Sequence, residues 1–236
     1  MRPVAIFRFS ASEGPGFFAE WLEGRGIPYE VIAIDGGAPV PPDLRAYSGV
    51  GMMGGPMSVN DPLPWISPLC EFLRHAVDAK VPVVGHCLGG QLLSYALGGT
   101  VTRAEKPEIG WIDVDVDEAA AGQWFGGQAR FTSFQWHYDT FTLPPGAQRL
   151  LHNKFIPNQA FVFDDRHIGL QCHVEMTDEL VRTWCATGSA ELPLGSTPNV
   201  QSAADIQRDL RTRVGALQEI ASSLYSRWAR ALGGAG

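Results

Sequence analysis

The stretch that decides the fold is Val81-Pro-Val-Val-Gly-His-Cys-Leu-Gly-Gly-Gln-Leu-Leu-Ser-Tyr-Ala-Leu97. A short β-branched apolar run is followed directly by glycines around Cys87, and then by apolar residues at helical spacing. This order predicts a strand, a sharp turn and a helix, with Cys87 at the apex. The spacing Gly-x-Cys-x-Gly is the thiol form of the nucleophile elbow, in which flanking glycines permit a strained turn that pushes one side chain out above the sheet.

Cys87 is therefore a candidate nucleophile. A thiol at the start of a helix lies near the positive end of the helix dipole, which favours thiolate over thiol. The backbone amide of Leu88 would point at an oxyanion that the thiolate creates. Because free cysteines are also often small buried apolar residues, the elbow alone leaves both interpretations open.

Composition limits the class of protein. The chain has 236 residues, of which 45% are hydrophobic, and a net charge of -7, which suits one globular domain or a domain with an appendage. The acidic balance argues against a nucleic-acid or anionic-membrane surface. The four cysteines lack the spacing of a metal site, so we expect no metal or cofactor and reduced thiols in the cytoplasm. No stretch approaches the length of a membrane span, and the apolar run at the N-terminus is too short for a signal peptide.

The pattern before and after the elbow predicts an α/β fold with an open, mostly parallel sheet and helices on both faces. Apolar segments at 3–9, 29–34 and 49–53 read as strands, and 14–26 and 66–77 carry helical periodicity. Beyond the elbow helix, shorter strands predict a small antiparallel addition; they are expected at 109–116, 129–135, 149–153, 160–163 and 168–172.

The C-terminal part of the chain differs in composition from the rest. Residues 188–199 are rich in turn-forming residues, and Ser202-x-x-Asp205 resembles a capping box that begins an amphipathic helix reaching Trp228. We therefore expect an α/β domain over 1–187, and over 188–236 a linker and C-terminal helix that pack on the same domain. A homo-oligomer or partner surface is the alternative use of the apolar face of this helix.

Candidate catalytic partners for the Cys87 thiol occur in the segment Gly169-Leu-Gln-Cys-His-Val-Glu175. A cysteine nucleophile needs a base and a third group that orients the base. His173 and Glu175 are two positions apart, so an extended segment places both on one side. If that strand ends beside the elbow, His173 can reach Cys87 while Glu175 holds the imidazole, although such a pair alone is weak evidence.

Three motifs occur in the following order along the chain: the turn Gly54-Gly55-Pro56-Met57-Ser58, the elbow, and the segment that carries His173 and Glu175. Together they resemble class I glutamine amidotransferases, the type whose glutaminase domain is found in GMP synthase. Gln135-Trp-His-Tyr-Asp139 is similar to the free-standing GMP-synthase-like type. The resemblance implies a flavodoxin-like sheet and hydrolysis of the glutamine side-chain amide.

The resemblance also implies roles for single residues. Cys87 would form a γ-glutamyl thioester, His173 would act as base and then as acid, and Glu175 would orient His173. The backbone amides of Gly55 and Leu88 would form the oxyanion hole. The positions implied to contact the substrate are Gln91, Trp136 and His137. For Gln91 an ordinary surface amide is the alternative, and for His137 a histidine packed under the loop.

The chain departs from the family pattern beside the histidine. An aromatic residue and a proline are usual there, and this chain has Cys172 and Val174. Because neighbouring residues of a strand point to opposite faces, we expect Cys172 to lie in the core rather than to resolve a disulfide. His86 is expected to point away from the sulfur for the same reason.

Three functional hypotheses follow. The first is a glutamine amidotransferase-type hydrolase that releases ammonia, either free or to a separate synthase, since the sequence has no Gly-x-x-x-x-Gly-Lys-[Ser/Thr] loop. The second keeps the same residues in a γ-glutamyl peptidase or hydrolase that acts on a small γ-glutamyl compound. The third is a non-catalytic regulatory subunit, which the joint presence of Cys87, His173 and Glu175 argues against.

Overall fold

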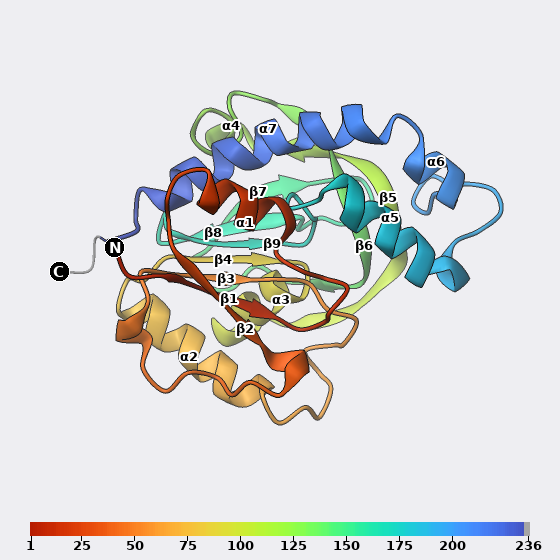
Figure 1. Cartoon of the computed structure of the whole chain (residues 1–236). Helices are drawn as coiled ribbons and strands as arrows, with labels where there is room; N and C mark the ends of the chain where they lie inside the picture. The colour runs from red at the N-terminus through yellow and green to blue at the C-terminus, as the bar shows by residue number, and fades with distance from the viewer. Residues whose placement is uncertain (234–236) are drawn as a thin grey trace.

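The computed structural model describes residues 1–233 and consists of one nine-stranded sheet with helices on both faces (Figure 1). The strands are β1 (Val4–Arg8), β2 (Tyr29–Ala33), β3 (Gly49–Met52), β4 (Val83–His86), β5 (Val101–Val116), β6 (Arg130–Phe141), β7 (Gln148–His152), β8 (Ala160–Phe163) and β9 (His167–Leu170). The α-helices are α1 (Gly16–Glu23), α2 (Ile66–Asp78), α3 (Leu88–Ala96), α4 (Glu118–Trp124), α5 (Asp178–Thr187), α6 (Ala203–Gln207) and α7 (Leu210–Ala229).

The strand order is β2-β1-β3-β4-β9-β8-β7-β5-β6. The run from β2 to β9 is parallel, and every pairing from β9 to β6 is antiparallel. The open α/β fold expected from the sequence is thus confirmed. Its antiparallel half is larger than expected, because β5 and β6 extend over 16 and 12 residues and pair with each other along most of that length.

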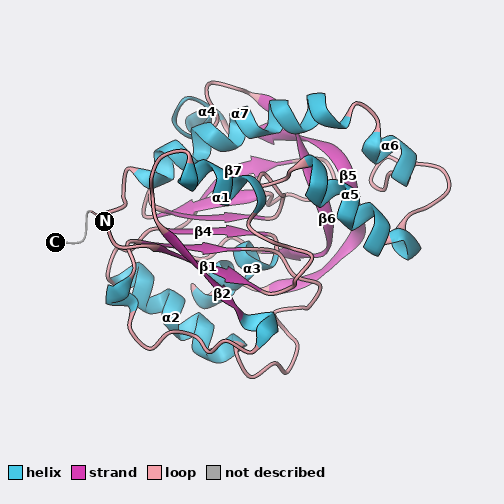
Figure 2. Cartoon of the chain, viewed as in Figure 1, coloured by secondary structure: helices cyan, strands magenta, loops and turns pink. Residues whose placement is uncertain are grey.

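Each face of the sheet carries its own apolar core. Helices α2 and α3 cover one face, and α1 and α7 cover the other (Figure 2). Helix α2 buries one face against the sheet because its apolar side chains recur at helical spacing. These buried residues are Ile66, Leu69, Cys70, Phe72, Leu73 and Ala76. In the described part of the chain, no helix has the length and apolar character that crossing a bilayer requires.

The C-terminal segment differs from the expected single helix. The chain forms the short α6 and then α7, because Arg208 is extended and Asp209 adopts a left-handed backbone with φ of 52°. Ser202 caps α6, as expected, by accepting a hydrogen bond from the Asp205 amide. The apolar face of α7 lies in the core beside α1, and α4 occupies a Gly- and Ala-rich stretch for which the sequence indicated no helix.

Candidate active site

The turn between β4 and α3 has the strained geometry of an elbow. Cys87 has φ of 49° and ψ of -108°, a region that residues with a side chain rarely occupy. The glycines allow the first turn of α3 to lie directly on β3. A Cβ on Gly89 would come within 2.6 Å of both the Cβ and the carbonyl oxygen of Met52. The glycine spacing of the sequence is therefore a packing requirement of this turn.

Strand β9 brings the second half of the site to the elbow. It lies parallel to β4, with His86 paired to Leu170, so both strands end at the same edge of the sheet. The Cys87 amide donates to the Leu170 carbonyl at 2.8 Å, and three residues past Leu170 the His173 amide donates to the Phe134 carbonyl, also at 2.8 Å. Two segments that are far apart in the sequence are in this way fixed side by side.

His173 and Glu175 form a buried pair. Nδ1 of His173 donates to Oε1 of Glu175 at 2.6 Å, and the two residues are 1% and 2% exposed. The other ring nitrogen, Nε2, is buried and has no hydrogen-bond partner among the described residues. The imidazole is thus oriented through Nδ1, and Nε2 remains available to exchange a proton.

The electrostatics of the pair favour the imidazolium form. Burial lowers the pKa of His173, but the Glu175 carboxylate and the nearby Cys87 sulfur outweigh burial, and the net pKa is raised well above the ordinary value of 6.5. Burial raises the pKa of Glu175, the charge of His173 opposes it, and the net pKa is below 4.5. At neutral pH the pair therefore carries both charges.

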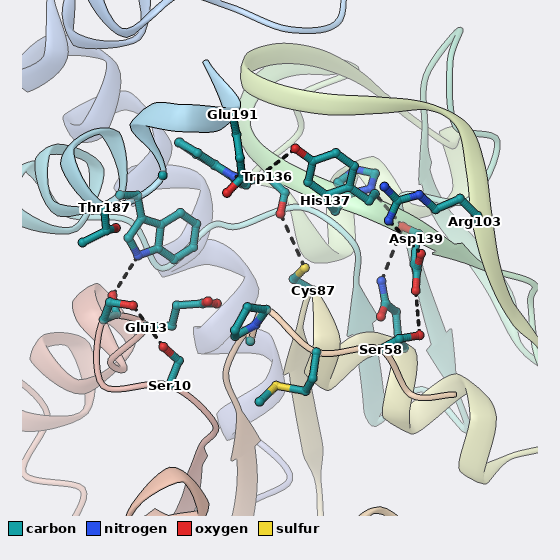
Figure 3. Close-up of a pocket in the computed structure, with 18 residues that line it drawn as sticks. Ser10, Glu13, Ser58, Cys87, Arg103, Trp136, His137, Asp139, Thr187 and Glu191 are labelled. Carbon is teal, nitrogen blue, oxygen red and sulfur yellow. Dashed lines mark hydrogen bonds and ion pairs between the residues drawn. The ribbon is translucent and has the colours of Figure 1, made fainter. Parts of the chain in front are cut away.

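Cys87 lines a cavity (Figure 3). The side chain is 6% exposed, the Gln171 amide Nε2 donates to the sulfur at 3.6 Å, and the sulfur lies 3.9 Å from the Trp136 carbonyl oxygen. An amide donor stabilises a thiolate more than a thiol. Cys87 is therefore both nearly buried and part of the wall of an open cavity.

The two residues expected to supply the oxyanion donors are in contact with each other. A Cβ on Gly55 would be 2.8 Å from Cδ2 of Leu88, so the Gly55 turn packs on the first residue of α3. Within the described residues, neither backbone amide donates to a protein acceptor. Both N–H groups therefore remain available for an anionic ligand.

The cavity has a volume of about 320 Å³ and two distinct sides. On one side Ser58 donates to Asp139 at 2.8 Å, and the Arg103 guanidinium lies 3.7 Å from the same carboxylate. On the other side are Ser10, Glu13, Thr187 and Glu191 (Figure 3). The space is larger than a single carboxamide requires.

The three expected substrate contacts all line this cavity, each with further partners. The Gln91 amide is buried and donates to Gln171 Oε1 at 3.2 Å, so it is not a surface amide. The Trp136 indole donates to Glu191 at 3.2 Å. His137 is 3% exposed and its Nε2 lies 3.0 Å from the buried Glu108 carboxylate, so it both lines the cavity and packs beneath it.

Cys172 and Val174, which depart from the family pattern, are fully buried. Burial raises the pKa of the Cys172 thiol to about 12, so this thiol stays protonated at neutral pH. Among the described residues, no group of three or more His, Cys, Asp and Glu side chains could hold a metal ion.

The sequence interpretation missed Glu13. It follows β1 at the carboxyl edge of the sheet, and its carboxyl packs beside Gly54 next to Cε1 of His173. Burial raises the pKa of Glu13 to about 7, and the His173 charge partly opposes the rise. Its position after the first parallel strand was the available signal, since sites gather at that edge.

Comparison with known proteins places the chain in a family. The model of glutamine amidotransferase class-I matches residues 19–183, which is more than half of the chain. The chain belongs to the class I glutamine amidotransferase family. A glutamine amidotransferase-like protein of Salmonella typhimurium is 30% identical over 72% of this chain and 74% of its own length. Gamma-glutamyl peptidase 4 of Arabidopsis thaliana is 28% identical over 63% and 61%.

Solved structures agree with this membership. The crystal structure of a glutamine amidotransferase from Methylobacillus flagellatus is 47% identical, with a TM-score of 0.96, and the similarity covers 98% of this chain and 96% of that one. The similarity therefore includes the C-terminal helices as well as the segment matched by the family model.

Proposed function

We propose that this member of the family is a cysteine-nucleophile hydrolase that releases ammonia from the side-chain amide of glutamine. The observation that carries the proposal is the strained elbow that holds the Cys87 sulfur in an open cavity beside the charged pair of His173 and Glu175. A thiolate next to an imidazolium is the activated form of a cysteine nucleophile.

The first half of the reaction forms a thioester. The Cys87 thiolate attacks the carbonyl carbon, and the Gly55 and Leu88 amides bind the oxyanion that results. The His173 imidazolium then gives its Nε2 proton to the departing nitrogen, and the carbon–nitrogen bond breaks to release ammonia. Glu175 holds the ring through Nδ1 during this transfer.

Water completes the cycle. The neutral His173 removes a proton from a water molecule, which attacks the γ-glutamyl thioester, and glutamate leaves as the Cys87 thiolate returns. Gln91, Trp136 and His137 are proposed to contact the glutamyl group, since all three line the cavity. Each step uses a group of the chain or water.

A γ-glutamyl compound is the second candidate substrate. The cavity continues past the sulfur to Ser10, Glu13 and Thr187, which leaves room for a leaving group larger than ammonia. The similarity to an Arabidopsis gamma-glutamyl peptidase favours the same interpretation. The thioester chemistry would be unchanged, because only the departing amine differs.

The proposal also covers the fate of the ammonia and the location of the protein. Ammonia would pass to a separate synthase or be released. The protein would work in the cytoplasm, which fits its four free cysteines. A purely regulatory role is the alternative that a direct assay excludes or supports.

The test is ammonia release by the purified chain from glutamine, compared with cleavage of γ-glutamyl dipeptides. Activity on glutamine supports the first substrate, and activity on dipeptides alone supports the second. Cys87→Ala should abolish either activity while leaving the circular dichroism spectrum unchanged. Cys185→Ala, at a buried thiol of α5, is the matched control. Full activity in Cys87→Ala, or no hydrolysis by the wild type, would contradict the proposal.

A further inference from the structure

A chain of buried polar groups runs from Glu175 through His86 to helix α7. His86 is fully buried, and its Nε2 lies 2.9 Å from the Tyr225 hydroxyl and 4.0 Å from Oε2 of Glu175. Its Nδ1 lies 3.1 Å from the Met52 carbonyl oxygen. These contacts link the elbow strand to a helix beyond residue 183, where the match to the family model ends.

The Met52 contact decides where His86 carries its proton. A carbonyl oxygen only accepts hydrogen bonds, so Nδ1 must be the donor. In the neutral ring Nε2 then has a lone pair, which accepts the hydrogen bond donated by the Tyr225 hydroxyl. Burial lowers the pKa of His86 and raises the pKa of Tyr225 well above 10, so the ring stays neutral and the phenol keeps its proton.

This arrangement leaves one oxygen of Glu175 without a donor. Oε1 accepts from His173, whereas the buried Oε2 has no hydrogen-bond partner among the described residues. Neutral His86 presents a lone pair, not an N–H group, to Oε2. The charge of Glu175 is therefore balanced mainly by His173, which holds its proton more tightly as a result.

We propose that Tyr225 is a positioning residue of the active site: its hydrogen bond keeps His86 neutral and so reserves the Glu175 carboxylate for His173. The inference rests on the proposed function, because it concerns the same nucleophile and base. None of the described residues of α7 lines the cavity, yet through Tyr225 this helix belongs to the site.

Removing the hydroxyl has a definite consequence. In Tyr225→Phe the buried lone pair of His86 Nε2 loses its donor, which is costly. Protonation of Nε2 relieves this, because the new N–H can turn to Oε2 of Glu175. The carboxylate is then shared between two rings, and His173 holds its proton less firmly.

Other ionisable groups face these rings and remain unchanged by the substitution. Glu13 and Cys87 face His173, and Cys172 lies near both Glu175 and Tyr225. Because they are the same in both proteins, a difference between wild type and Tyr225→Phe reports on the hydroxyl.

The experiment measures the rate at which iodoacetamide alkylates Cys87 as a function of pH, read by mass spectrometry on the full chain. In Tyr225→Phe the midpoint of this profile should move up by about half to one pH unit, since a less basic His173 supports the thiolate less well. Trp228→Phe is the control. Trp228 lies on the same helix, packs on Phe18 as Tyr225 does, and its indole nitrogen has no hydrogen-bond partner among the described residues.

A second background tests whether Tyr225 acts through His86. In His86→Phe, which keeps an aromatic ring but lacks both nitrogens, adding Tyr225→Phe should cause no further shift. The proposal is overturned by no shift in the wild-type background, by an equal shift in both backgrounds, or by an equal shift in Trp228→Phe.

A measurement on the wild type keeps the test decisive if a variant fails to fold. Nitrogen-15 NMR should show His86 as the neutral Nδ1–H form from pH 6 to 8, and an Nε2–H form or titration of His86 in this interval would overturn the proposal. A wild-type Cys87 that reacts no faster than a free thiol at pH 7 would overturn both the proposed function and this inference. A reactive Cys87 with no shift in Tyr225→Phe would overturn this inference alone.

Discussion

Nδ1 of His173 lies 2.6 Å from Oε1 of Glu175, in a pair that is almost completely withdrawn from solvent. A buried charge is tolerated only where an opposite charge and hydrogen bonds compensate its desolvation. Each member of the pair therefore depends on the other for its charge. The reactivity that we propose for Cys87 depends in turn on the imidazolium.

Glu175→Gln should break this dependence. The amide keeps the size of the side chain but loses its charge, so the pKa of His173 falls and the imidazolium becomes scarce at neutral pH. We expect kcat for glutamine to drop by about 10³-fold or more, since loss of the triad carboxylate in serine hydrolases costs on the order of 10⁴. Steady-state ammonia release measures the drop. An activity within about tenfold of the wild type would contradict the orienting role of Glu175.

The same substitution should lower the stability of the fold in a pH-dependent way. The interactions that raise the pKa of His173 stabilise the folded state fully below pH 6.5, the ordinary pKa of histidine, and this contribution disappears as pH rises through the raised pKa. The interactions that lower the pKa of Glu175 stabilise the folded state above pH 4.5, and this contribution disappears as pH falls through the lowered pKa. The loss of unfolding free energy in Glu175→Gln should therefore be largest between these limits, near pH 5 to 6.5, by urea denaturation.

The elbow was predictable from sequence because its requirements are local. The glycines around Cys87, the β-branched run before it and the apolar helix after it all lie within 17 residues of sequence, 81–97. The strands at the start of the chain were predictable for the same reason. The cap at Ser202 was also indicated by its own residue and by Asp205 three positions later, and it is confirmed.

The unpredicted features depend on distant contacts. His86 and Tyr225 are 139 positions apart, and only the packing of α7 on the sheet brings them together. The first half of β5 is polar and contains Pro107, and its own pattern does not indicate a strand. It joins the sheet because the residues on both sides of a register shift between Arg103 and Glu108 pair with β6. The left-handed Asp209, which divides the expected C-terminal helix, has no signal in the helical periodicity around it. The domain boundary expected at residue 187 stays a prediction.

Two glycine substitutions test the packing of the elbow. Gly89→Ala would push a Cβ into Met52, including its backbone oxygen, so β3 and α3 must separate. Overpacking of this kind costs about 1–3 kcal/mol of unfolding free energy. Gly215→Ala, on the exposed side of α7 with open space around it, should instead stabilise the protein by about 0.5–1 kcal/mol. Urea denaturation of both variants distinguishes steric conflict from a general effect of alanine, and equal changes in the two would refute the close approach.

The carboxyl of Glu13 should make the stability of the protein fall as pH rises toward 7. Burial raises its pKa from 4.5 to about 7, so between these values the unfolded chain releases a proton that the folded chain retains. Glu13→Gln imitates the protonated form. It should be within about 1 kcal/mol of the wild type at pH 5 and exceed it at pH 8 by up to about 3 kcal/mol, less any relief from solvent at the cavity mouth. Urea denaturation at both pH values measures this, with Glu20→Gln on the exposed side of α1 as the control. Because ionised Glu13 also supports the His173 imidazolium, Glu13→Gln should lack a step near pH 7 in the rate of Cys87 alkylation. If the stability difference from the wild type is the same at pH 5 and pH 8, Glu13 does not titrate in this interval.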